Sequence, residues 1–254
     1  MQVLQTSSIA SLHDIHCATR ISKPSLLRIL NTLEHAGVVS RRLADGYYRL
    51  SAFGRAPRKR DAHERGAEAA APVLDRLCHK VKWPSDLFVP AGDHMERRET
   101  SRALSPFVIH TAFHTPRRIG AKVNWLLTGV GRAYLAHCPS GERERILEKL
   151  RRSDKPEDRL ARDPRRLEQI FAETRARGFG VRDPSYAGAP YGGPPADDGL
   201  AGMAIPLQDG THVYGSINIL WIKAAFTIDE FAARHLADLQ EAGREIVAAL
   251  KTRP

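Results

Sequence analysis

Two short amphipathic helices are predicted near the start of the chain, because apolar residues recur there every three to four positions. The first helix begins after Ser11, whose side chain can cap it. The second begins after Ser22, carries Pro24 in its first turn and ends at Gly37. The inner faces of the two helices are formed by Leu12, Ile15, Ala18, Leu26, Ile29, Leu30 and Leu33. This spacing predicts a pair of helices joined by a tight turn.

The outer face of the second helix is polar. In a helix–turn–helix, the second helix enters the major groove of DNA with its first turns nearest the bases. Hydroxyl and cationic side chains in those turns can donate to phosphates or bases. The candidate DNA contacts of this helix are Ser22, Lys23, Pro24, Ser25 and Arg28. An ordinary helical hairpin with a solvated polar face is the alternative.

The next stretch, residues 38–51, is typical of two short strands around a turn that contains Asp45-Gly46. Arg41, Arg42 and Arg49 lie along it. Helix, helix and basic hairpin is the order of a winged helix–turn–helix, in which the hairpin follows the DNA backbone and neutralises phosphates. Arg41 and Arg42 therefore join the candidate DNA contacts.

The rest of the chain is predicted to contain a linker, a connecting helix and a domain of strands and helices. The linker covers the basic stretch 52–60, and the connecting helix runs from about His63 to Lys80. This helix either joins the two domains or pairs with its copy in a dimer, and it is a candidate for part of the dimer contact. Strands are expected at 85–91, 95–100, 107–112, 119–127, 200–207 and 213–222. Helices are expected after Thr128, Ser140, Asp163 and Thr227.

Residues 180–199 are rich in glycine and proline and predict a long irregular loop, either a binding loop or an excursion without order. We expect residues 1–52 to form the DNA-binding domain, 53–82 the linker and connecting helix, and 83–254 a second domain. Residues 1–6 are too short for the helix that usually precedes such a pair, so the first helix is expected to be truncated.

Composition narrows the class of protein. The 254 residues contain no apolar run long enough to span a membrane, and the start lacks the pattern of a signal peptide. Three scattered cysteines form neither a disulfide framework nor a metal-ligand pattern, which favours a reducing cytoplasm. The formal net charge is +10, and residues 1–60 hold 10 Lys and Arg against 3 Asp and Glu. This concentration of positive charge favours a nucleic-acid partner for the N-terminal part.

The order of these motifs resembles that of the isocitrate lyase regulator (IclR) family of bacterial transcription factors, over nearly the whole chain. The matching stretches are ISKPSLLRILNTLEHAGVV, LLTGVGRAYLAHCP, ARGFGVRD, GLAGMAIPL and VYGSINIL. The runs WPSDLFV and MERRETSR are similar to the branch that controls catabolism of phenylpropionate-type aromatic acids. The resemblance implies an α+β protein with a winged helix–turn–helix and a C-terminal GAF-like (profilin-like) effector-binding domain. It also implies a homodimer or homotetramer that binds operators of catabolic genes.

The resemblance further implies where a small carboxylic acid effector binds. The pocket would be lined by the segment leading into the TGVG helix and by the last two strands. The candidate residues are Trp125, Leu126, Thr128, Gly129, Gly202, Met203, Asn218 and Leu220. Gly202, Asn218 and Leu220 depart from more polar residues common in the family, which predicts an apolar pocket suited to an aromatic acid. Arg182, on the glycine-rich loop, is a possible lid cation, and Arg98 is a further cation that could pair with an acid.

Residues that suggest an enzyme have simpler explanations. His137 and Cys138 are adjacent on a helix and point about 100° apart, so they cannot act as a base and its nucleophile. Asp197-Asp198, and Glu96 with Glu99, are explained by solvated faces. Gly129 and Gly131 allow either close helix packing or approach of an effector carboxylate to a helix start. No metal-ligand or dinucleotide motif is present, so we expect neither metal nor cofactor and no catalytic residues.

Two function classes remain. The first is a DNA-binding regulator controlled by a small carboxylic acid, aromatic in kind, and it is favoured by the basic N-terminal segment. The second is a small-molecule-binding or hydrolytic domain whose truncated N-terminal part no longer binds DNA.

Overall fold

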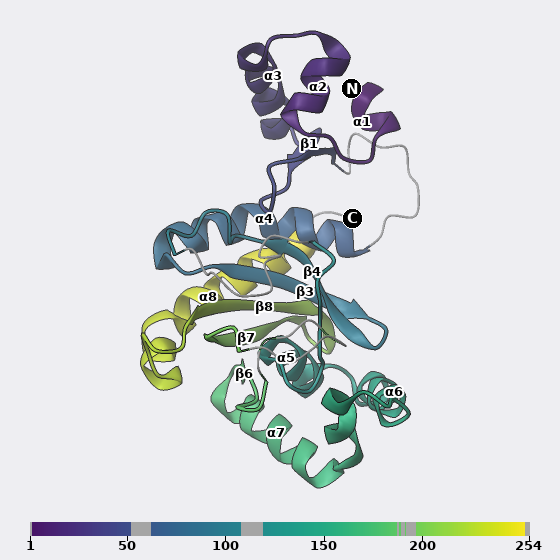
Figure 1. Cartoon of the computed structure of the whole chain (residues 1–254), viewed down its shortest axis with the longest axis vertical. Coiled ribbons are helices and arrows are strands. Elements are labelled where there is room, and N and C mark those ends of the chain that lie inside the picture. The colour runs from purple at the N-terminus through teal and green to yellow at the C-terminus, as the bar shows by residue number, and fades with distance from the viewer. Residues whose placement is uncertain are drawn as a thin grey trace.

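The computed structural model describes residues 2–51, 62–107, 119–186, 188, 191 and 197–251. A small N-terminal unit of helices and a hairpin lies at one end of a larger unit in which helices cover both faces of a sheet (Figure 1). The α+β class predicted from the sequence is confirmed. The predicted linker at 52–60 and all but the first residue of the predicted strand at 107–112 lie outside the described residues.

The N-terminal unit has the predicted order of elements. It contains α1 (Gln2–Thr6), α2 (Leu12–Thr19), α3 (Lys23–His35), β1 (Val39–Arg41) and β2 (Tyr48–Leu50). Ser11 and Ser22 cap α2 and α3 as predicted, since each side-chain oxygen accepts from a backbone N–H. The core of this unit consists of Leu4, Ala10, Ile15, Leu26, Leu30, Val39, Tyr48 and Leu50.

Two details of this unit differ from expectation. Residues 2–6 form a helical turn of their own, which buries Leu4 in the small core. Ile29 is 46% exposed, so the inner stripe of α3 is narrower than predicted. The main contacts of α3 within the unit are with α2 and β1, and the buried leucines of α3 are Leu26 and Leu30.

The larger unit is built on one antiparallel sheet with the strand order β5-β4-β3-β8-β7-β6. Its strands are β3 (Ser85–Ala91), β4 (His94–Thr100), β5 (Lys122–Val123), β6 (Gly180–Val181), β7 (Leu200–Asp209) and β8 (His212–Ile222). The predicted strand at 119–127 is only two residues long, because the chain turns at Asn124 toward the next helix. Strand β6 falls in the stretch predicted to be a loop.

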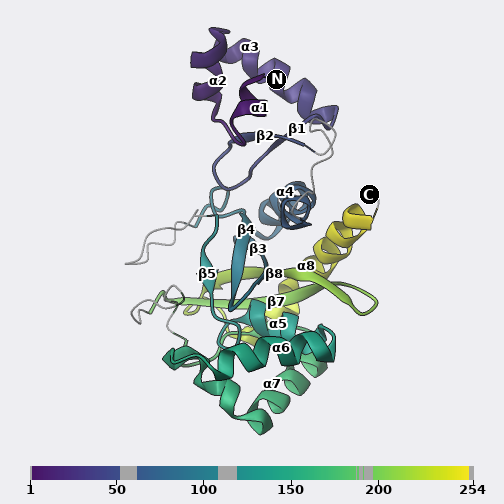
Figure 2. The same cartoon turned by 90° about the vertical axis from the view of Figure 1, so that its right-hand side faces the viewer.

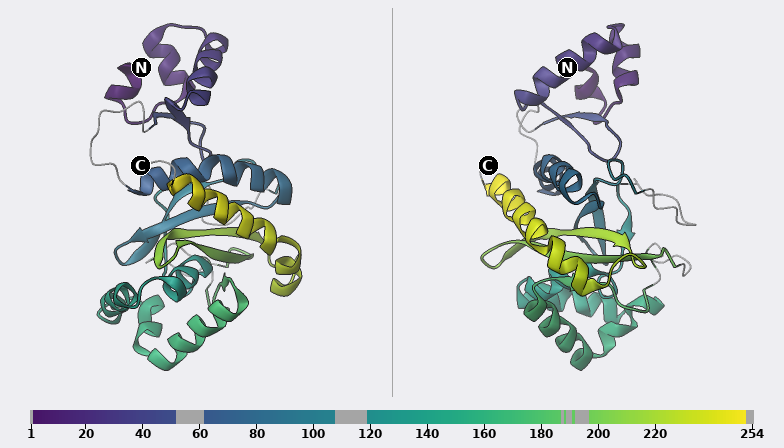
Figure 3. Two further views of the ribbon diagram at one scale, coloured as in Figure 1. Left: turned by 180° about the vertical axis from the view of Figure 1, so that it is seen from behind. Right: turned by 90° about the vertical axis from the view of Figure 1, so that its left-hand side faces the viewer.

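One face of the sheet is covered by α4 (Ala62–Val81) and α8 (Ile228–Lys251), which cross in Figure 3. The apolar side of α4, including Ala70, Leu74 and Leu77, is buried in the core of its own chain. This face is occupied by α8 and strands β3 and β4 of the same chain, so a dimer contact through α4 would have to use its other faces. Thr227 caps α8, as predicted, by accepting from the N–H of Glu230.

The other face carries α5 (Gly129–His137), α6 (Ser140–Arg151), a 3-10 helix η2 (Pro156–Arg162) and α7 (Pro164–Arg177). Thr128 and Asp163 cap α5 and α7, as predicted. Ser140 is the first residue of α6 rather than its cap, because Pro139 takes the capping position without a side-chain hydrogen bond. Among the described helices, none is both long and apolar enough to cross a membrane.

The two units touch where the turn of the hairpin reaches strand β4 (Figure 2). The carboxylate of Glu99, on β4, accepts from the backbone N–H groups of Leu43 at 3.3 Å and Ala44 at 3.1 Å. Arg49 was expected on the surface of the hairpin but is only 8% exposed. Its Nε atom lies 3.5 Å from a carboxylate oxygen of Glu68 on α4. The hairpin is therefore anchored to the larger unit by a buried carboxylate and a buried ion pair.

Candidate functional site

A cavity of about 350 Å³ opens between the start of α5, strands β3, β4, β7 and β8, and the segment after β6. Small-molecule sites in proteins begin at about this size. Seven of the nine predicted effector contacts line it: Thr128, Gly129, Arg182, Gly202, Met203, Asn218 and Leu220. Most of the residues that the resemblance implied therefore lie around one cavity.

Trp125 and Leu126 do not line this cavity, so their assignment is wrong. Trp125 is 0% exposed and Leu126 is 1% exposed, and both pack in the core beneath α5. The ring centroids of Trp125 and Tyr134 are 5.4 Å apart. Asn124 causes this orientation, because its side-chain oxygen accepts from the N–H groups of Leu126 and Leu127 and holds the turn. The sequence could not show which way a turn of this kind points its side chains.

The start of α5 packs closely on its surroundings. A Cβ at Gly131 would lie 2.1 Å from the carbonyl oxygen of Trp125, and one at Gly129 would lie 2.9 Å from the carbonyl oxygen of Gly180. Both glycines therefore permit close packing, although Gly129 also borders the cavity. The Thr128 hydroxyl is already used, since it donates to the carbonyl of Asn124 and accepts from the N–H of Gly131.

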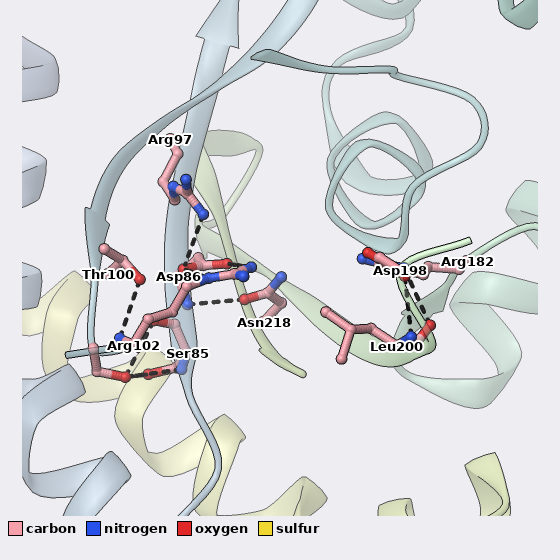
Figure 4. Close-up of polar contacts among 10 residues, drawn as sticks. Ser85, Asp86, Arg97, Thr100, Arg102, Arg182, Asp198, Leu200 and Asn218 are labelled. Carbon is pink, nitrogen blue, oxygen red and sulfur yellow. Dashed lines mark hydrogen bonds and ion pairs between the residues drawn. The ribbon is translucent and has the colours of Figure 1, made fainter. Parts of the chain in front are cut away.

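Sequence reasoning missed the charged cluster at one end of the cavity (Figure 4). Asp86, on β3, is fully buried and accepts from Arg102 through both carboxylate oxygens, at 3.2 and 2.8 Å. Arg97, on β4, lies 3.7 Å from the same carboxylate. Asn218, on β8, accepts from the backbone N–H of Asp86 at 2.8 Å. This end of the cavity is therefore an Arg–Asp–Arg arrangement held between three strands.

The signal for this cluster was present in the alternation of strand β4. Successive side chains of a strand point to opposite faces. Arg97 faces the cavity, whereas its neighbour Arg98 pairs with Glu96 at 2.8 Å and does not line it. Arg98, considered as a cation that could pair with an acid, therefore does not border the cavity, whereas the adjacent Arg97 does.

The cluster stays charged near neutral pH. Burial would raise the pKa of Asp86, but the guanidinium groups of Arg102 and Arg97 outweigh it and hold that pKa below its usual 3.8. Burial lowers the pKa of Arg97 to about 10, against the opposing effect of Asp86.

A second ion pair lies at the opposite end of the cavity. Arg182 donates to both oxygens of Asp198, at 2.7 and 3.0 Å, and to the carbonyl of Leu200 at 3.1 Å. The predicted lid cation is thus present at the cavity but already paired. The expectation of an apolar pocket is wrong, because charged residues lie at both ends, while Phe88, Met203 and Leu220 supply apolar walls between them.

The residues that first suggested an enzyme do not form a catalytic arrangement. Burial raises the pKa of the Cys138 thiol to about 12, which disfavours the nucleophilic thiolate. Nδ1 of His137 lies 2.9 Å from the carbonyl oxygen of Ala133, within its own helix. Within the described ranges, no group of three or more His, Cys, Asp or Glu is arranged to hold a metal.

The predicted DNA contacts lie on α3 and the β1–β2 hairpin, and Figure 1 shows α3 at the opposite end of the molecule from α5, whose start borders the cavity. Lys23 and Arg28 are exposed on α3 and form no ion pair with the described residues, and Ser22, Pro24 and Ser25 form the first turn of that helix with its cap. Arg41 is exposed, whereas Arg42 forms an ion pair with Asp45. The hairpin turn that carries Arg42 points toward β4 rather than away from it.

Comparisons with known proteins cover nearly the full length of the chain. No protein-family model matches it. One curated relative is the probable transcriptional regulator SauR of Cupriavidus necator, which is 24% identical over 239 residues, or 93% of this chain and 88% of SauR.

Several solved structures share the fold. The Thermotoga maritima IclR matches with a TM-score of 0.57 at 19% identity, over 98% of this chain and 94% of that one. An IclR homologue from Microbacterium hydrocarbonoxydans, complexed with 4-hydroxybenzoate, matches with a TM-score of 0.54 at 19% identity, over 96% and 92%. An IclR-family transcriptional regulator from Brucella abortus has a TM-score of 0.54 at 18% identity, over 96% and 86%. The chain therefore has the fold of this family, whose members named here are regulators rather than enzymes.

Proposed function

We propose that this protein is a DNA-binding transcriptional regulator of the IclR family that acts on catabolic genes in response to a small carboxylic acid. The observation that carries the proposal is the pairing, in one chain with this fold, of a basic helix–turn–helix and a separate cavity of small-molecule size. The relative SauR, which spans both parts, is named as a transcriptional regulator.

The recognition helix in this proposal is α3. Lys23, Ser25 and Arg28 lie in its first two turns, and the two cations have no competing ion pair among the described residues. Arg41 is the better phosphate contact of the hairpin, because Arg42 would first have to leave Asp45. An exposed, unpaired cation gains more from a phosphate than one that must exchange partners.

A gel-shift experiment with DNA upstream of the neighbouring operon tests DNA binding. Arg28→Ala should weaken binding by about 1–3 kcal/mol and relax the sequence preference, if Arg28 reads a base. Arg41→Ala should weaken binding to all sequences alike and flatten its salt dependence. Arg152→Ala is the control, because Arg152 is exposed on the larger unit, and it should change neither the affinity for DNA nor its salt dependence. No retardation by the unaltered chain would contradict the proposal.

The effector in this proposal is an aromatic carboxylic acid bound in the cavity. Phe88, Met203 and Leu220 offer apolar surface to a ring, and arginines offer donors to a carboxylate. The Microbacterium neighbour is complexed with 4-hydroxybenzoate, an acid of this kind. Calorimetry of the chain with benzoate, 4-hydroxybenzoate, phenylpropionate, pyruvate and glyoxylate tests this choice. Binding of the two short acids without any aromatic acid would contradict it.

The protein in this proposal works as a homodimer or homotetramer. One winged domain contacts too short a stretch of DNA to select a site in a genome, so two copies on a two-fold operator are expected. Because the apolar face of α4 is occupied within the chain, the contact between copies uses another surface. Light scattering with and without DNA measures the assembly, and a monomer in both cases would contradict this part.

A further inference from the structure

The two ends of the cavity differ in charge (Figure 4). At one end, two guanidinium groups, from Arg97 and Arg102, face the single carboxylate of Asp86. At the other end, Arg182 and Asp198 balance each other one to one. Counted over these five residues, the first end has an excess of one positive charge, and the second is neutral and offers carboxylate oxygens.

The excess charge lies largely out of water. Asp86 is 0% exposed and Arg97 is 5% exposed. Within the described part of the chain, Asp86 and Arg102 are charged groups that act on Arg97, and Asp198, which also acts on Arg102, is itself paired with Arg182. A buried net charge is costly unless an opposite charge accompanies it. This end of the cavity is consequently suited to an anion that enters from the cavity side.

Arg102 also keeps donors for a second partner. Its Nε and Nη2 atoms donate to the two oxygens of Asp86, a pairing that fixes the plane of the guanidinium group. A guanidinium group has five N–H donors, and those of Nη1 are not used by Asp86. Asp86 thus holds Arg102 in one orientation before any ligand arrives, which lowers the entropy lost when a carboxylate binds.

From these contacts we propose that the effector is an acid with a hydrogen-bond donor at the end opposite its carboxylate. This proposal rests on the proposed function above. Its carboxylate binds Arg97 and Arg102, and its donor, a hydroxyl or amino group, binds Asp198. The ring lies between the apolar walls. This arrangement moves the acid group from the start of α5 and Arg182, where the sequence placed it, to the end of the cavity formed by β3 and β4.

Calorimetry on the full chain tests this site with three probes: 4-hydroxybenzoate, benzoate and 4-hydroxybenzamide. Arg97→Gln leaves Asp86 balanced by Arg102, so the fold should persist. It should weaken 4-hydroxybenzoate binding about 10- to 100-fold, the range for one charge-assisted hydrogen bond, and leave the uncharged benzamide unaffected. Arg98→Gln is the matched control on the same strand, and it should change neither.

Asp198→Asn tests the other end. It should reduce the preference for 4-hydroxybenzoate over benzoate, because the amide oxygen can still accept from the hydroxyl but no longer carries a charge. Melting curves establish whether each variant folds. If Arg97→Gln does not fold, Arg97→Lys keeps the charge and should bind the acid about 3- to 10-fold more weakly, with the benzamide unchanged.

The outcomes separate this site from the wider proposal. If Arg97→Gln, or Arg97→Lys in its place, binds 4-hydroxybenzoate as tightly as the unaltered chain does, the assignment of the acid group is overturned. The effector proposal would then still stand. An unaltered chain that retards operator DNA but binds none of the aromatic acids would overturn both the site and the effector class. DNA binding would then remain as the established part of the proposed function.

Discussion

At the scale of single residues, Asp86 links the chemistry of the cavity to the stability of the fold. Its carboxylate neutralises two arginines in a buried place, and an uncompensated buried charge is destabilising. Because the pKa of Asp86 in the folded protein is held below its usual 3.8, the ionised form stabilises the fold above about pH 4, and this stabilisation is lost as pH falls through the lowered pKa.

Asp86→Asn is therefore expected to lower the free energy of unfolding by about 3–5 kcal/mol at pH 7. The difference from the unaltered chain should shrink on acidification below pH 4, as the carboxylate of the unaltered chain becomes protonated. Urea unfolding at pH 7 and at pH 3 measures both values. Asp154→Asn, at an exposed position, is the control, and an Asp86→Asn difference that does not depend on pH would contradict the argument.

The substitution Gly131→Ala tests whether the start of α5 is closely packed. A Cβ there would overlap the carbonyl oxygen of Trp125, which is backbone and cannot move aside as a side chain can. Gly131→Ala should therefore destabilise the protein by about 1–3 kcal/mol, although alanine favours a helix. Gly141→Ala, in α6 with open space around it, should be neutral or stabilise by up to about 1 kcal/mol. Thermal unfolding of both variants decides, and similar melting temperatures would contradict the packing argument.

At the scale of elements, strand β4 connects the hairpin with the cavity. Glu99 of this strand holds the hairpin turn, and Arg97, two residues before it, faces the Asp86 cluster. In Glu99→Ala the N–H groups of Leu43 and Ala44 lose their acceptor, and we expect their hydrogen exchange to accelerate about 10-fold or more. Glu96→Ala on the same strand is the control, since Glu96 pairs only with Arg98 in the hydrogen bonds described. Unchanged exchange at both amides would contradict this anchoring role.

The elements themselves could be predicted from the sequence wherever periodicity and caps agreed. Thr128, Asp163 and Thr227 each mark a helix start correctly, because a cap acts through bonds within its own first turn. The strands and the helix start that border the cavity were implied by the family resemblance rather than by periodicity or caps. Trp125 was misassigned because its orientation depends on Asn124, a contact of the folded turn. Arg97 was overlooked because its importance comes from Asp86 on another strand.

At the scale of the whole molecule, the contacts at the hairpin make the two units interdependent. The chain joins a strongly basic N-terminal part to a C-terminal part that holds the cavity, and Glu99 and the Arg49–Glu68 pair link them. An effector can alter DNA affinity only if it binds one arrangement of these units better than another. The contact at Glu99 and the Arg49–Glu68 pair are two described places where such a difference can pass between them.

Linkage gives this idea a quantitative test. If 4-hydroxybenzoate changes operator affinity by some factor, operator DNA must change the affinity for 4-hydroxybenzoate by the same factor. We expect Glu99→Ala to bring both factors closer to one, by an equal amount, because it removes a contact between the units while leaving the lining of the cavity and the exposed face of α3 intact. Fluorescence anisotropy with labelled operator, with and without the acid, gives one factor, and calorimetry with and without operator gives the other. Coupling factors that stay at the values of the unaltered chain would show that the Glu99 contact does not transmit the signal, and the Arg49–Glu68 pair would then be the next described contact to test.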